Sequence, residues 1–176
     1  MPDVDFYAHV ATHGKVLGAG IGSGPAEWEA ALGPDHLDDR SEGLLRRDYG
    51  LVELSFRQEG DAWPCFAVSV QVHRLLQGGT SVPQPLQDAY GPFAGRLRFD
   101  ELSAAIAGLG HGVEPDDDGT ATDVRRYWVS GSGARIHVVA DVDPYGYGDV
   151  DPDDPTEPRV GDVRSIGFSP DWWSAQ

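Results

Sequence analysis

The chain has 176 residues, of which 40% are hydrophobic, so it can build a core and is not expected to be disordered as a whole. Twenty-nine acidic residues against 13 basic ones give a formal net charge of -16, which argues against binding to nucleic acid or to an anionic membrane. The sequence has no apolar run of the roughly 18 residues that a membrane helix needs, and residues 1–10 lack the pattern of a signal peptide. Cys65 is the only cysteine, which excludes an internal disulfide. We therefore expect a cytoplasmic protein.

The first part of the chain is predicted to hold one edge strand, within residues 1–17, and one short helix. The glycine-rich run LGAGIGSGP does not match the dinucleotide fingerprint G-x-G-x-x-G in any register, and no phosphate-loop pattern follows it. The run is interpreted as the approach to a helix that begins at Pro25, carries Trp28 and Leu32 on one face and ends at Gly33.

Arg46 to Leu76 is the stretch around which we expect the fold to be organised, because it holds two strand-like runs joined by a short polar loop. In each run apolar residues alternate with polar ones, which is the period of a half-buried strand. The apolar positions are Val52, Leu54 and Phe56 in the first run and Phe66, Val68, Val70 and Val72 in the second. The charged segment 35–48 before them is expected to be connecting chain.

The second half is predicted to follow the same order of a helix and then strands. Segment 81–95 is interpreted as a linker, and Asp100 is expected to cap a helix that stops at Gly110. Strands are predicted at 124–130, 134–140 and 163–168.

A similar spacing in the two halves suggests an internal repeat. Gly33 precedes Tyr49 by 16 residues, and Gly110 precedes Tyr127 by 17. Chance periodicity is the alternative, because only order and spacing match. We expect an α+β fold, an antiparallel sheet with two helices packed on one face, in a single compact domain with tandem helix-hairpin halves at 1–79 and 80–176.

Residues 141–162 contain eight acidic residues and one arginine among prolines and glycines, so they are expected to form an exposed loop. An EF-hand loop that began at Asp141 would need a glutamate where Pro152 stands. One that began at Asp149 would need a glycine where Asp154 stands. Whether this loop binds calcium remains open.

The sequence shows no catalytic motif. It has no G-x-S-x-G elbow, and Cys65 is expected to be a buried, inert thiol. His9 and His13 have the spacing of helical zinc ligands but lack the glutamate of the protease motif between them. His73 and His137 are isolated candidates for proton transfer. We predict no enzyme, no catalytic residue, no cofactor and no metal site.

The polar faces of the predicted strands form a candidate recognition surface that mixes charges, hydrogen-bonding groups and an aromatic anchor. An ordinary solvent-facing sheet side is the alternative. The candidates are Glu53, Ser55, Arg57, Ser69, Gln71 and His73 from the first half, Trp128, Arg135 and His137 with Arg126 from the second, and Asp149, Asp151 and Asp153 from the acidic segment.

The stretch EWEAALGPDHLDD, followed by LLRRDYGLVELSF and FAVSVQVHRL, resembles the small immunity proteins encoded beside polymorphic toxins in high-GC bacteria. The later RVGDVRSIGFSP is similar to their C-terminal strand. A helix that ends in Leu-Gly before a strand beginning near Tyr-Gly is also similar to the repeat of the beta-lactamase inhibitor protein, in which a helical element packs on an antiparallel sheet. The resemblance covers residues 26–76 best, and it departs from the secreted inhibitor in lacking a signal sequence and disulfide cysteines.

The resemblance implies a protein that binds and occludes a cognate toxin without chemistry of its own, and the acidic charge favours a basic toxin such as a nuclease. Two alternatives remain open. A small-molecule-binding protein or small enzyme would have a pocket near His73 or His137. A structural or chaperone-like module would dimerise through an apolar face that includes Trp172 and Trp173. The sequence does not identify the toxin or the oligomeric state.

Overall fold

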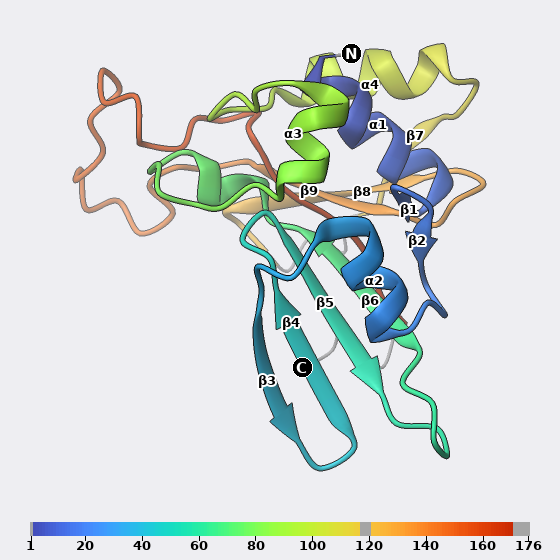
Figure 1. The fold of residues 1–176 in the computed structure, drawn as a ribbon. Helices are drawn as coiled ribbons and strands as arrows, with labels where there is room; N and C mark the ends of the chain where they lie inside the picture. Colours follow the sequence, from blue (N-terminus) through green and yellow to red (C-terminus); the bar gives the residue numbers. More distant parts are fainter. Residues whose placement is uncertain (1, 117–120, 171–176) are drawn as a thin grey trace.

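The structure is a computed structural model that describes residues 2–116 and 121–170 (Figure 1). It confirms the α+β class: an eight-stranded antiparallel sheet carries helices on one of its faces. The described residues form the helices α1 (Asp3–His13), α2 (Pro25–Leu32), α3 (Gln84–Tyr90) and α4 (Phe99–Gly108), and the 3-10 helix η1 (Val72–Leu75). None of these helices has the length and apolar character to cross a membrane.

The sheet has the order β3-β4-β5-β6-β10-β9-β8-β7. In each half the first strand lies at an edge of the sheet and the last strand lies at its centre. The first half contains β3 (Leu37–Ser41), β4 (Leu44–Asp48), β5 (Val52–Arg57) and β6 (Cys65–Val70). The second half contains β7 (Val113–Pro115), β8 (Val124–Val129), β9 (Arg135–Val139) and β10 (Val163–Phe168). A separate small pair is formed by β1 (Lys15–Val16) and β2 (Ala19–Gly20).

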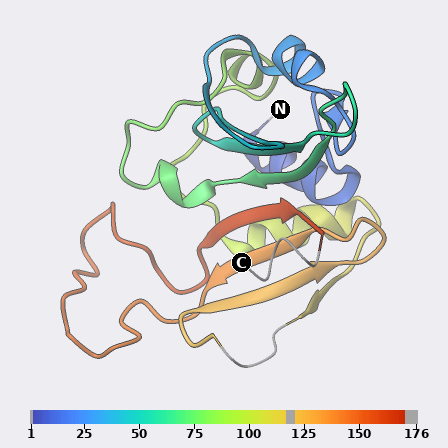
Figure 2. The same ribbon diagram turned by 90° about the horizontal axis from the view of Figure 1, so that it is seen from below.

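The two halves meet where β6 pairs with β10, which Figure 2 shows as adjacent green and red strands in the middle of the molecule. Val70 lies opposite Ile166 and Ser69 lies opposite Gly167. Each half therefore has a helix followed by four antiparallel strands, α2 with β3 to β6 and α4 with β7 to β10.

The core lies between the helices and one face of the sheet. Trp28 of α2 is fully buried, as are Leu54 of β5 and Ile166 of β10. Fully burying a side chain of this size stabilises the fold by about 1.5–3 kcal/mol, so this layer supplies the main driving force. Within the described residues no helix covers the opposite face of the sheet, which is called the open face below.

The predicted helix at Pro25 is confirmed, with Trp28 and Leu32 on its buried side. The Glu27 carboxylate accepts a hydrogen bond from the Gly24 N–H at 3.2 Å and closes the helix start. Strands β5, β8, β9 and β10 also lie where the alternating patterns predict them, and β10 covers the predicted residues 163–168.

The predicted edge strand within residues 1–17 is wrong, because Asp3–His13 is helical. Phe6 and Val10, four residues apart, are both buried, and Asp3 and Asp5 lie in the first turn, where acidic side chains favour the helix dipole. The apolar residues of this segment therefore follow the period of a helix. The small residues among them made this period hard to recognise in the sequence.

Two segments predicted as connections contain regular structure. Residues 35–48 hold the hairpin β3–β4, in which β3 is exposed along its whole length and so carries no hydrophobic pattern. Segment 81–95 holds α3, whose Leu86 is fully buried. Asp100 lies in the first turn of α4 rather than at its cap, which is Arg98.

Candidate functional site

The candidate site is a furrow on the open face that runs across β5, β6, β10, β9 and β8, with a volume of about 330 Å³. Successive side chains of a strand point to opposite faces of the sheet. Val52 and Leu54 of β5 face the core, so Glu53 and Ser55 point into the furrow. The sequence candidates that line the furrow are Glu53, Ser55, Ser69, Gln71, Arg126, Arg135 and His137. Both halves of the sheet therefore contribute to one surface.

Small side chains at the junction of the two halves make the hollow. Ser69 of β6 lies opposite Gly167 of β10, and Ser165 of β10 lies opposite His137 of β9. A Cβ atom added at Gly167 would come within 3.2 Å of the carbonyl oxygen of Val68, a tight contact, so glycine favours the close approach of the strands here. The low floor of the furrow follows from these residue sizes.

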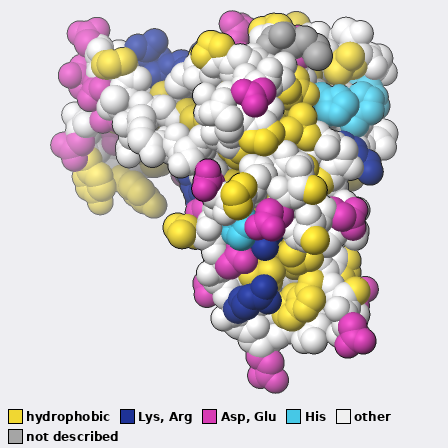
Figure 3. All heavy atoms as spheres, viewed as in Figure 1, with side chains coloured by type: hydrophobic (Ala, Val, Ile, Leu, Met, Phe, Trp, Pro, Cys, Tyr) yellow, Lys and Arg dark blue, Asp and Glu magenta, His cyan; other side chains and the backbone are white. Residues whose placement is uncertain are grey.

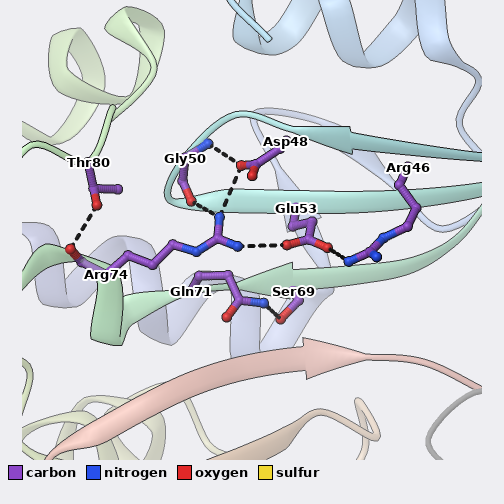
Figure 4. A network of polar contacts seen from close by, with 8 residues as sticks. All are labelled: Arg46, Asp48, Gly50, Glu53, Ser69, Gln71, Arg74 and Thr80. Atoms are coloured by element: carbon purple, nitrogen blue, oxygen red, sulfur yellow. Dashed lines mark hydrogen bonds and ion pairs between the residues drawn. The ribbon is translucent and has the colours of Figure 1, made fainter. Parts of the chain in front are cut away.

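On the first-half side, Glu53 is held by two arginines (Figure 4). Arg46 donates to one carboxylate oxygen, and Arg74 donates to the other at 3.0 Å. Arg74 also donates to the Asp48 carboxylate at 3.0 Å and to the Gly50 carbonyl at 2.9 Å. The network fixes the Glu53 carboxylate in place.

Gln71 lies beside this network, and its side-chain amide donates to the Ser69 hydroxyl at 2.8 Å (Figure 4). An amide and a hydroxyl offer both donors and acceptors to an incoming chain. The centre of the furrow is therefore suited to hydrogen bonding with a backbone or a polar side chain.

On the second-half side, His137 lies between charged neighbours. Its Nδ1 is 3.3 Å from the Ser165 hydroxyl. Burial lowers the pKa of His137, and the positive charges of Arg126, Arg164 and Arg135 lower it further. The imidazole is therefore neutral at pH 7 and presents one donor and one acceptor.

Arg126 and Arg135 share Asp116 as an acidic partner. Their Nε atoms lie 3.2 and 3.8 Å from an Asp116 carboxylate oxygen. The Arg135 guanidinium also lies 5.9 Å from the ring centre of Trp128, which is 38% exposed. Trp128 is thus placed as an aromatic contact at the margin of the furrow.

The charge of the furrow differs from that of the whole chain. Its lining has three arginines, Arg46, Arg126 and Arg135, and one carboxylate, Glu53, whereas the chain has a formal charge of -16. The excess of acidic residues is found elsewhere, notably in the loop between β9 and β10.

Three groups of predicted contacts lie outside the furrow. His73 belongs to η1, because the second strand ends at Val70 and not at His73 as predicted. It lines a separate hollow of about 290 Å³, and its Nδ1 is 3.2 Å from the Arg164 carbonyl oxygen. Arg57 lines another hollow with Phe66. Asp149, Asp151 and Asp153 lie in the exposed β9–β10 loop.

The predicted alternation in the second run fails at its start. The pairing of β5 with β6 shifts register between Ser55 and Phe56, so Cys65 faces the core and Phe66 is only half buried. Burial raises the pKa of the Cys65 thiol to about 12, which agrees with the inert thiol that we expect at this position.

Sequence reasoning missed part of the furrow. Arg46 lies in β4, which was predicted as connecting chain, and Arg74 reaches Glu53 from η1. Ser165 and Gly167 lie in the predicted strand 163–168 but were not among the candidates. They flank the apolar Ile166, and this alternation could have assigned them to the polar face of the strand.

Within the described residues, no group of three or more histidine, cysteine or acidic side chains is arranged to hold a metal ion. In the acidic loop, the Asp143 carboxylate accepts hydrogen bonds from the N–H groups of Tyr147 and Gly148. These bonds shape the loop locally.

Comparison of the chain with protein families, curated proteins and solved structures gave no match.

Proposed function

We propose that the protein binds a protein partner through its open face and neutralises it, as an immunity protein neutralises its toxin, without chemistry of its own. The observation that supports this function is the furrow. It collects an aromatic side chain at its margin, arginines and uncharged hydrogen-bonding groups from both halves of the sheet, a composition that favours protein contacts.

The charge distribution supports a basic partner such as a nuclease, met in the cytoplasm. Long-range attraction depends on the net charge of -16, and much of it lies in the β9–β10 loop, which extends away from the sheet in Figure 1. Contact then depends on the furrow, where arginines and Glu53 can pair with opposite charges on the partner. Attraction and contact thus use different parts of the molecule.

The test is capture of the product of the neighbouring gene at low and high salt, together with survival of cells that express both proteins. We expect a complex whose association slows as salt rises, because the Debye length falls from about 8 Å at 0.15 M to about 3 Å at 1 M. The proposal would be overturned if no complex forms and the cells are not rescued.

A pair of variants locates the contact. Ser69→Trp fills the centre of the furrow and is expected to abolish capture, since Ser69 and Gln71 form its floor. Ala104→Trp adds the same side chain to the exposed surface of α4, in the helix layer, and should leave capture unchanged. If both variants capture the partner equally well, the open face is not the contact.

The hollow beside His73 supports a small-molecule ligand as the second candidate function. Val139, Val142 and Pro158 give it apolar walls, and Asp123 and Arg164 give it charges of both signs. A ligand that protects His73 from chemical modification and leaves capture unchanged would favour this candidate. The dimerisation alternative rests on Trp172 and Trp173, which lie outside the described residues.

A further inference from the structure

The C-terminal part of α1 carries two histidines on one side of the helix. His9 and His13 are four residues apart, and their rings stack with 4.4 Å between ring centres and 18° between ring planes. Figure 3 shows histidine side chains gathered at one place on the surface near this end of α1. The pair lies apart from the furrow and has no role in the function proposed above.

A hydrogen bond with Thr12 favours one tautomer of His13. The Thr12 hydroxyl donates its single proton to the Ala8 carbonyl oxygen at 2.8 Å. The same Oγ1 lies 2.9 Å from Nδ1 of His13, so while the hydroxyl donates to Ala8 it can accept a hydrogen bond from Nδ1–H. In that tautomer Nε2 of His13 has a free lone pair, as a metal ligand requires.

We propose that His9 and His13 chelate a divalent transition-metal ion. Two histidines at i and i+4 on a helix are the spacing with which helical zinc sites hold their ion. Imidazole suits copper, nickel and zinc, with metal–nitrogen bonds of about 2.0–2.1 Å for zinc. Chelation requires the stacked rings to rotate so that one nitrogen of each faces the same ion, and water then supplies the remaining ligands.

The test is calorimetric titration of the whole chain with Ni²⁺, and then with Cu²⁺, at pH 7.5. Excess Mg²⁺ is present throughout, because carboxylates of the β9–β10 loop prefer a hard cation. We expect one ion per chain, with Cu²⁺ bound more tightly than Ni²⁺. At pH 5.5 binding should weaken, because protons compete for the imidazole nitrogens.

The variants His9→Gln and His13→Gln each remove one ligand and should lower the affinity roughly tenfold or more. His111→Gln is the matched control, since it removes a histidine that follows α4, outside α1 and the furrow, and should leave the affinity unchanged. Circular dichroism confirms that each variant is folded. Absence of Ni²⁺ binding, or equal affinity in the two α1 variants and the control, would overturn the metal site while leaving the toxin-binding proposal untouched.

Discussion

Each half of the sheet buries one charged side chain near the start of its helix, and the two charges have opposite sign. In the first half Arg47 of β4 is 5% exposed and donates to the Pro25 carbonyl oxygen at 2.9 Å, where α2 begins. In the second half Asp162, 3% exposed, accepts from Arg98, the cap residue of α4, at 2.7 Å. Each half therefore places a buried charge at the start of its helix, an arginine in the first half and an aspartate in the second.

The two charges differ in how completely they are paired. Arg47 forms a two-point ion pair with Asp38 of the edge strand, at 2.9 and 3.2 Å. Asp162 is held by Arg96 and Arg98 and also accepts from the Arg159 N–H at 2.8 Å, so it ties the end of the acidic loop to the start of α4. A charge taken out of water is tolerated only with such partners, and Asp162 pairs with two opposite charges whereas Arg47 pairs with one.

The largest effect is therefore expected for Asp162→Ala. The variant leaves Arg96 and Arg98 without their carboxylate, and breaking a buried pair costs about 3–5 kcal/mol. Urea unfolding followed by tryptophan fluorescence measures the loss. Asp153→Ala, in the exposed part of the same loop, should not change the midpoint. A loss below about 1 kcal/mol for Asp162→Ala would show that the buried pair is not what holds this half together.

A smaller effect is expected for Arg47→Met, about 2 kcal/mol at pH 7, because Asp38 is left partly open to water. Burial alone would raise the pKa of Asp38, but the hydrogen bond and charge of Arg47, with those of His36, lower it below its ordinary value of 3.8. The stabilisation from this pair is therefore present above pH 3.8 and is lost as the pH falls through the lowered pKa.

The measurement is the free energy of unfolding of wild type and Arg47→Met from pH 7 to pH 2. The difference between them should narrow below pH 3.8 as Asp38 takes up its proton. Arg125→Met, at an exposed arginine of β8, controls for loss of a strand arginine and should match wild type at every pH. A constant difference across the range would contradict a role for the Asp38 charge.

The strands that the sequence predicts are those whose side chains alternate in polarity. Val52–Arg57 and Val163–Phe168 have this pattern because one face of each packs on the helices. β3 could not be found in this way, because its five residues are all exposed and its Leu37 is 78% exposed. Its pairing with β4 and the ion pair of Arg47 with Asp38 hold it in place, and both depend on tertiary structure.

The sequence predicts those parts of the candidate site that depend on polar and apolar residues alternating along one strand. It does not predict the parts that depend on pairing between strands far apart in the chain. Glu53, Ser69 and His137 could be assigned to polar strand faces from their neighbours in sequence. Their gathering in one furrow depends on β6 pairing with β10, strands separated by more than 90 residues, and local patterns cannot specify such a contact. His73 was assigned to a strand because the alternation continues past Val70, although the backbone turns there into η1.

The smallest effect on the free energy of unfolding is expected at Tyr49 and Tyr127, the two tyrosines whose spacing suggested the repeat. The Tyr49 hydroxyl donates to the Gly33 carbonyl oxygen at 3.2 Å, so the residue tethers the end of α2 to the loop before β5. Tyr127 instead stacks on Phe99 with 4.2 Å between ring centres, and within the described residues its hydroxyl makes no hydrogen bond. The same spacing thus serves a hydrogen bond in one half and a ring contact in the other.

Tyr49→Phe should therefore lower the free energy of unfolding by about 1 kcal/mol, the value of one buried hydrogen bond. Tyr127→Phe keeps the ring on Phe99 and should stay within about 0.5 kcal/mol of wild type. Urea unfolding of the two variants side by side gives the comparison, and each serves as the control for the other. Equal losses would mean that the two tyrosines are equivalent after all, whereas the expected difference means that only the spacing, and not the contact, is shared between the halves.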